Sequence, residues 1–196
     1  MTDSTASQVV PQRPMRADAR RNYDKLIAAA REAFVDDDSS ASLEDIARRA
    51  QVGIGTLYRH FPTRKDLLAA VYQEEVEALC RSAADFADLP PWEALAGWMH
   101  RFVGYANTKK AVAAELVNYV APDDEVFRSC RDAVHAAGNA LLERAKAAGD
   151  VRPDVEFTDI VRMVVSIATM RGTEPEQVER ILDLALDGLR YRSTAS

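Results

Sequence analysis

The stretch that decides the fold is SLEDIARRAQVGIGTLYRHFPTRK, residues 42–65. It contains two short segments with helical periodicity, 43–50 and 54–60, which are joined by Gln51-Val52-Gly53. Apolar side chains on both segments are spaced so that the two helices can pack crosswise. This spacing predicts a helix-turn-helix unit, in which the second helix enters the major groove of DNA.

The residue types around the second helix suit that task. The major groove is about 12 Å wide, so the first residues of an entering helix must be small or polar. Residues 42–65 carry five basic and two acidic side chains, a local charge of +3 that favours phosphates. The start of the next helix, capped by Thr63, adds backbone amides that can hold a phosphate. The residues predicted to contact DNA are Gly53, Ile54, Gly55, Thr56, Tyr58, Arg59, His60, Arg64 and Lys65.

Composition and charge set the broad class of the protein. Of the 196 residues, 47% are hydrophobic and 29% are charged, which is typical of a globular chain and excludes a disordered acidic tail. The net charge is −6, but residues 1–72 carry 11 basic and 10 acidic side chains, whereas residues 73–196 carry 14 and 21. The acidity therefore lies in the C-terminal part, and the N-terminal part stays compatible with nucleic acid.

The location that the sequence indicates is the cytoplasm. No apolar run approaches the roughly 20 residues of a membrane span, and the first 21 residues have no apolar core that could serve as a signal peptide. The two cysteines, Cys80 and Cys130, form at most one bridge, and reduced thiols are the simplest interpretation.

The pattern along the chain predicts an all-α fold with three parts. Residues 1–17 have no periodicity and predict a flexible arm, 18–72 the DNA-binding domain, and 73–196 a helical C-terminal domain. The prolines fall between helical segments or in their first turns. About nine helices are expected, over 18–36, 43–50, 54–60, 63–86, 92–107, 107–120, 123–148, 157–170 and 176–192.

The motif GTLYRHFPTRKDLL, within Ser42–Tyr72, resembles the TetR/AcrR family of bacterial transcription regulators, named after the tetracycline repressor. This resemblance covers about a third of the chain. It implies a homodimer that reads a pseudo-palindromic DNA operator, most often as a repressor, and a C-terminal bundle that binds a small-molecule effector. It implies no cofactor, no metal and no enzymatic activity.

The resemblance also assigns roles to individual residues. Ser42 and Arg64 match phosphate-binding positions, while Thr56, Tyr58 and His60 match residues of the recognition helix that touch bases or phosphates. The chain departs from the family at the turn, where Gln51 replaces a frequent Gly and Gly53 replaces Ser or Thr. A left-handed Gln51 would cost roughly 1 kcal/mol.

For the C-terminal domain the resemblance implies an effector cavity and a dimer interface. The cavity candidates are aromatic or polar-ended side chains on its helices: Trp98, Phe102, Tyr105, Tyr119, Phe127, His135, Asn139 and Met163. The last helix is apolar on two sides, which indicates a second partner beyond its own core. The interface candidates on the last two helices are Val161, Val164, Val165, Ala168, Val178, Ile181, Leu182, Ala185 and Leu189.

Other interpretations of these residues stay open. An aromatic stripe at helical spacing also suits a core, and the N-terminal helices could pack in an enzyme or a purely structural bundle. Cys130 fits a packed residue or a thiol sensor. Asp132 and His135 form a single D-x-x-H, whereas a di-iron bundle needs two such pairs, so no metal site is expected. Four arginines near the N-terminus could reach the minor groove: Arg13, Arg16, Arg20 and Arg21.

Overall fold

The computed structural model describes residues 17–35 and 41–190, and within these ranges it contains helices and no strand. The predicted all-α class is therefore confirmed. The proposed arm, apart from Ala17, lies outside the described residues, as do Arg13 and Arg16. The elements are α1 (Ala17–Val35), α2 (Leu43–Arg49), α3 (Ile54–His60), α4 (Arg64–Ser82), the 3₁₀ turn η1 (Ala83–Phe86), α5 (Pro91–Leu116), α6 (Glu125–Ala147), α7 (Phe157–Ala168) and α8 (Pro175–Asp187).

Two helices of the N-terminal module begin with capping boxes. The Ser42 hydroxyl accepts from the Asp45 amide at 3.1 Å, and the Ser42 amide donates to the Asp45 carboxylate at 3.2 Å. Thr63 and Asp66 repeat this exchange at the start of α4, at 3.2 and 3.0 Å. The cap at Thr63 was predicted from the sequence, and each capping box satisfies amides that the helix itself leaves unbonded.

The turn between α2 and α3 has the left-handed residue that the sequence suggested. Gln51 has φ of 56°, and Gly53 begins α3 with an extended backbone. The amide of Val52 donates to the Ala47 carbonyl at 3.0 Å, which closes the end of α2. The turn thus sets the angle at which α3 leaves α2.

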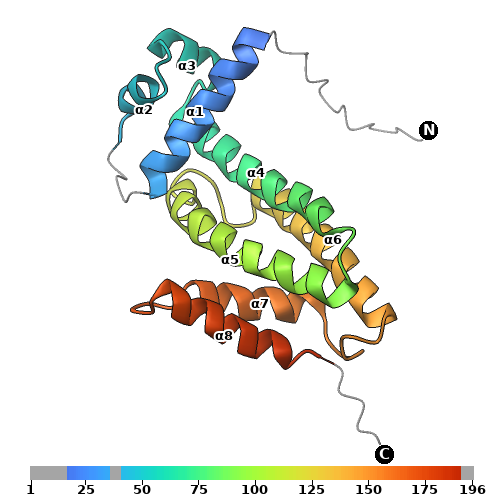
Figure 1. The fold of residues 1–196 in the computed structure, drawn as a ribbon. Coiled ribbons are helices and arrows are strands. Elements are labelled where there is room, and N and C mark those ends of the chain that lie inside the picture. Colours follow the sequence, from blue (N-terminus) through green and yellow to red (C-terminus); the bar gives the residue numbers. More distant parts are fainter. Residues whose placement is uncertain (1–16, 36–40, 191–196) are drawn as a thin grey trace, which may run out of the picture.

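The C-terminal domain is built on the long helices α4, α5 and α6. Figure 1 shows α1, α2 and α3 at one end of the molecule, with α4 leading away from them beside α5 and α6, and α7 and α8 on the side farthest from α2 and α3. No helix in the described ranges is long and apolar enough to cross a membrane.

One predicted helix boundary was wrong. A break was expected near residue 107, but α5 continues without interruption to Leu116. No proline or glycine stands between Gly104 and the end of the helix. Val112 and Leu116 are completely buried and extend the apolar stripe, so packing continues where a break was expected.

The close approach of α5, α6 and α7 depends on a glycine. A Cβ placed on Gly138 would lie 1.9 Å from the Phe157 ring and 2.7 Å from the Trp98 ring. Those two rings pack with their centroids 6.3 Å apart. The centre of the bundle therefore has no space for a side chain at this position of α6.

Candidate nucleic-acid interface and C-terminal cavity

The short helix α3 has one buried face and one exposed face. Leu57 is completely buried and Phe61 nearly so, and both anchor the helix to the module. On the other face Ile54 is 39% exposed and Tyr58 44% exposed, with Gly55 and Arg59 also exposed. This face of α3 is therefore open to a partner, while the opposite face holds the helix in place.

The predicted DNA contacts on α3 differ in how far they reach outward. The Tyr58 hydroxyl donates to Glu44 of α2 at 3.4 Å, which holds the ring on the outer surface. Thr56 is half-buried near the start of the helix. His60 is half-buried as well, because its ring packs edge-on against Tyr23 of α1 at 6.0 Å.

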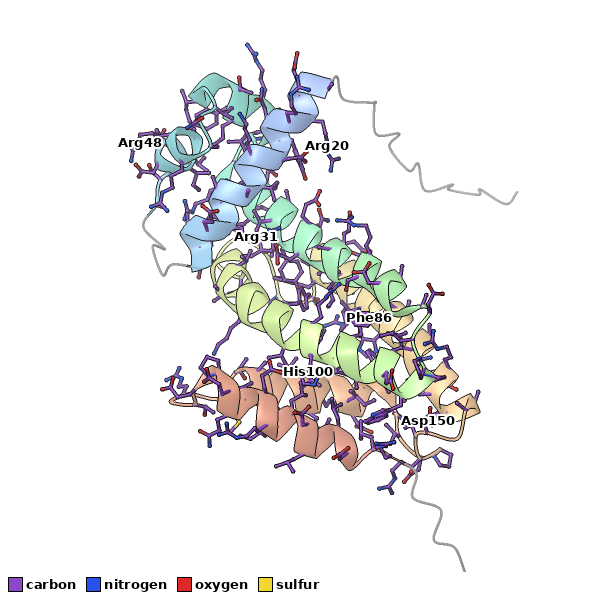
Figure 2. The ribbon with its side chains drawn as sticks, in the orientation of Figure 1. Arg20, Arg31, Arg48, Phe86, His100 and Asp150 are labelled. Atoms are coloured by element: carbon purple, nitrogen blue, oxygen red, sulfur yellow. The ribbon has the colours of Figure 1, made fainter. Side chains whose placement is uncertain are left out.

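The exposed basic residues surround this face. Figure 2 shows Arg48 on α2, and its guanidinium donates to Asp45 at 2.5 Å. Hydrogen bonds from Ser42, together with Arg48, lower the pKa of Asp45 below its ordinary value. Arg59 and Lys65 are exposed on α3 and α4. The module therefore has cationic side chains on three consecutive helices.

Two of the arginines that were predicted to reach DNA, Arg20 and Arg21, bind carboxylates within α1 instead. Arg20 donates to Asp24 at 3.0 Å, and Arg21 donates to Asp18. Arg64, predicted to bind phosphate, lies at the start of α4 but is mostly buried and contacts Glu115 at 2.6 Å. The sequence did not predict this last contact, since the two residues are far apart in the chain.

A cavity of about 510 Å³ lies in the C-terminal domain, between α4, α5, α6 and α7. Four of the predicted effector-binding residues line it: Phe102, Tyr105, Phe127 and His135. The lining residues that the sequence missed include three with polar or charged ends, Tyr72, Lys110 and Arg131. Tyr72, on α4, is the last residue of the predicted DNA-binding domain, and the other two have the pattern of ordinary surface charges.

The remaining effector candidates lie away from this cavity. Trp98 is a core residue, completely buried, and its indole donates to the Leu79 carbonyl at 3.1 Å. Tyr119 is exposed beyond the end of α5, and Met163 packs against the core. Asn139 borders a separate, more polar hollow on α6.

The predicted interface residues on α7 and α8 divide into three groups. Val164, Ala168 and Leu182 are buried inside the protomer and are not available to a partner. Val161 and Val165 line the cavity. The half-buried residues Val178, Ile181, Ala185 and Leu189 lie along α8 and the segment after it, while Leu184 of the same helix is 75% exposed.

Comparison with known proteins follows the same division of the chain. Residues 26–71, from α1 into α4, match the family described as "Bacterial regulatory proteins, tetR family". Residues 90–191, over half of the chain, match the family described as "Transcriptional regulator SbtR-like, C-terminal domain". This chain belongs to the TetR family of bacterial transcriptional regulators. The protein is therefore a DNA-binding transcriptional regulator.

Solved TetR structures resemble most of the chain. A TetR transcriptional regulator from Streptomyces coelicolor is 44% identical, with a TM-score of 0.75 over 88% of this chain and 99% of its own. A TetR regulatory protein from Mycobacterium vanbaalenii is 34% identical, with a TM-score of 0.75 over 91% of this chain and 100% of its own. The transposon Tn10 TetC protein of Escherichia coli is 24% identical over 131 residues, which span 64% of this chain and 66% of that protein.

Proposed function

We propose that this TetR regulator is a homodimeric repressor that binds a pseudo-palindromic operator and is released when a small molecule occupies the C-terminal cavity. The observation that carries the proposal is the face of α3, where Ile54 and Tyr58 are exposed while Leu57 is completely buried. A helix held in this way can present side chains to base edges without losing its own packing. The individual DNA contacts named above remain part of this proposal.

The proposed dimer uses the outer face of α8. Leu184, at 75% exposure, stands beside half-buried Ile181 and Ala185, so the helix keeps an apolar surface after its inner residues are packed. A two-fold contact of two such helices buries this surface on both copies. The dimer would then place two α3 helices in successive major grooves, about 34 to 36 Å apart or a multiple of that distance.

The proposed release depends on α4. This helix begins beside α3, and further along, Tyr72 forms part of the cavity wall. A molecule that favours a different position of the Tyr72 ring favours a different position of α4. An effector must bind the DNA-free arrangement more tightly than the DNA-bound one in order to release the operator.

The experiment is a selection of bound DNA from a random duplex pool at two salt concentrations. We expect an inverted repeat whose binding weakens at higher salt, because phosphate contacts release counterions. A refolded sample, freed of any co-purified ligand, is selected in parallel. If neither sample enriches a repeat, the operator-binding proposal is wrong.

The repeat then serves as the probe for release. The fluorescence polarisation of a labelled operator duplex is measured during titration with small-molecule libraries. A compound that lowers operator affinity in the wild type but not in a variant with a filled cavity, such as Val165→Trp, supports release through the cavity. Release that is equal in both proteins contradicts it.

A further inference from the structure

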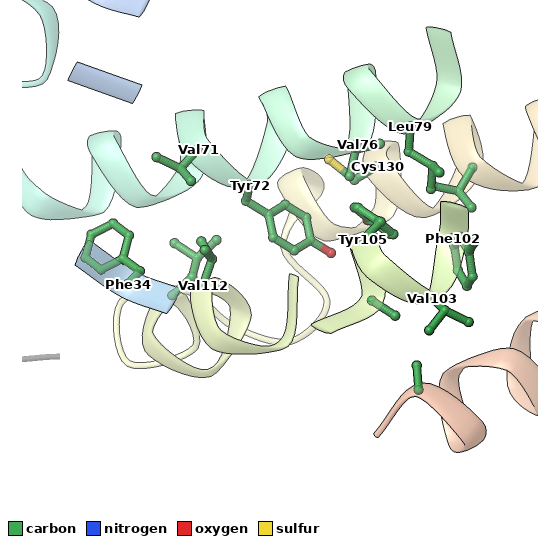
Figure 3. Close-up of a cluster of buried hydrophobic side chains, with 14 of the residues drawn as sticks. Phe34, Val71, Tyr72, Val76, Leu79, Phe102, Val103, Tyr105, Val112 and Cys130 are labelled. Atoms are coloured by element: carbon green, nitrogen blue, oxygen red, sulfur yellow. The ribbon is translucent and has the colours of Figure 1, made fainter. Parts of the chain in front are cut away.

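The interior of the C-terminal cavity is aromatic. Phe102 and Tyr105 of α5 pack at 5.4 Å between centroids, and Tyr72 meets Phe127 edge-on at 5.2 Å. Figure 3 shows the Tyr72 ring reaching from α4 into the space between α5 and α6, close to Tyr105. A volume of about 510 Å³ is within the usual range for a small-molecule site, so these walls fit a ligand with a ring-sized apolar body.

The lining of this cavity has basic side chains and no carboxylate among its described residues. Lys110 of α5, together with Arg131 and His135 of α6, belongs to its lining. Among the lining residues that the structure describes there is no aspartate or glutamate. Residues 73–196 carry 21 acidic and 14 basic side chains, so a lining without a carboxylate differs from the rest of this domain.

The two permanent cations are not neutralised by the protein. Neither Lys110 nor Arg131 has an ion pair with any described carboxylate, whereas Arg128, one turn earlier on α6, pairs with Glu125 at 2.5 Å. Glu75, whose charge acts on Tyr105, is itself held by Arg31 of α1. An anion in the cavity would therefore meet two cations whose charge is still available.

The two tyrosines add neutral donors. Burial raises the pKa of Tyr105 and of Tyr72 above the ordinary value of 10, and the positive charge of Arg131 offsets only part of this rise for Tyr72. Both phenols therefore keep their protons at neutral pH. A protonated phenol can donate a hydrogen bond to an anionic oxygen.

We propose that the cavity of this regulator selects an organic anion, with an aromatic or aliphatic body among Phe102, Tyr105 and Phe127 and a carboxylate or sulfonate head at Lys110 and Arg131. The inference deepens the effector role proposed above and rests on it. It gives the cavity a ligand class, which the family assignment alone does not.

A matched pair of fluorescent probes tests the sign of the charge. 8-Anilinonaphthalene-1-sulfonate carries an anionic head, and N-phenyl-1-naphthylamine has the same ring skeleton without it. Both gain fluorescence in apolar surroundings, so each Kd is measured by titration into the full-length protein. We expect the sulfonate to bind at least about tenfold more tightly, as a charge-assisted contact implies. Equal affinities, or tighter binding of the neutral probe, would overturn the proposal.

Three variants test whether the sulfonate probe binds inside the cavity. Arg131→Gln should weaken sulfonate binding about tenfold and change binding of the neutral probe less than twofold. Arg128→Gln is the matched control, since it removes the same charge from the same helix outside the cavity, and it should leave both affinities unchanged. Val165→Trp should weaken the binding of both probes, because the larger side chain fills the cavity. If Arg128→Gln acts as strongly as Arg131→Gln, or Val165→Trp changes neither affinity, the probe binds elsewhere and the assignment is wrong.

A separate readout distinguishes the ligand class from the effector role. Operator affinity is measured by polarisation with and without saturating sulfonate probe. Selective sulfonate binding with unchanged operator affinity supports the anion site and contradicts effector release. Operator release by both probes at equal affinity supports the effector role and overturns the anion class.

Discussion

The guanidinium of Arg64, the first residue of α4, donates from Nε to Oε1 of Glu115 near the end of α5, at 2.6 Å. The same side chain donates to the Ala41 carbonyl at 2.6 Å and lies 5.3 Å from the ring centroid of Phe34. Only 19% of the Arg64 side chain and 15% of the Glu115 side chain is exposed. One arginine thus links the DNA-binding module to the domain that contains the cavity.

The first prediction concerns the stability of this link. Glu115→Gln removes the carboxylate that pairs with this mostly buried guanidinium, and we expect the free energy of unfolding to fall by about 1–3 kcal/mol. A double-mutant cycle with Arg64→Met, measured by urea denaturation, isolates the pair. A coupling energy near zero would show that the contact does not stabilise the fold.

The second prediction concerns DNA affinity. If Arg64 also binds phosphate, as predicted from the sequence, Glu115 competes with DNA for the same guanidinium. Glu115→Gln should then raise affinity for DNA of any sequence and steepen the salt slope by about 0.9, whereas Arg64→Ala should reduce that slope by the same amount. Binding isotherms at several salt concentrations measure both. An unchanged slope in both variants would mean that Arg64 does not reach phosphate.

The third prediction separates base reading from phosphate binding. Tyr58→Ala should change which operator sequences are preferred, because the exposed ring would face the groove in the proposed complex. Lys65→Ala, at the exposed start of α4, should lower the affinity for all DNA sequences alike and reduce the salt slope by about 0.9. Tyr58→Phe keeps the ring and serves as the control. Selection from a random pool with each variant would contradict this division if Tyr58→Ala and Lys65→Ala gave the same preference.

The fourth prediction concerns the centre of the bundle. Gly138→Ala would place a methyl group against Phe157 and Trp98, and we expect a loss of about 1–3 kcal/mol in the free energy of unfolding. Gly104→Ala on α5 is the matched control, because its Cβ would meet open space. The free energy of unfolding of that variant should rise by roughly 0.5–1 kcal/mol, because alanine is more favourable than glycine inside a helix. Equal effects in urea denaturation would contradict the packing argument.

The fifth prediction concerns the turn of the helix-turn-helix. Gln51 has φ of 56°, a conformation that is strained for residues with a side chain. Gln51→Gly should raise the free energy of unfolding by up to about 1 kcal/mol, and Gln51→Val should lower it by about 1–2 kcal/mol because a β-branched residue fits worse. Thermal denaturation followed by circular dichroism compares the three proteins. A destabilised glycine variant would show that unfolded-state entropy outweighs the relief of strain.

The sequence was most informative where structure depends on near neighbours. The cap at Thr63 involves groups only three residues apart, and it was predicted from the sequence. The Glu115 contact joins residues 51 positions apart, and the cavity wall combines side chains from four helices. Their positions depend on how the helices pack, which periodicity along one helix does not specify. For the same reason Trp98, an aromatic residue at helical spacing, became part of the core.

The unbroken course of α5 has a mechanical consequence. At 1.5 Å per residue its 26 residues form a rod about 39 Å long, and this rod carries both cavity-lining residues such as Phe102 and Lys110 and, one or more turns later, Glu115. Because α5 is unbroken between these residues, we expect a ligand that displaces the cavity wall to displace Glu115 as well, and with it Arg64 of the DNA-binding module. If release occurs as proposed, the coupling is reciprocal, so a bound operator would lower the affinity for the ligand by the same factor by which the ligand lowers the affinity for the operator.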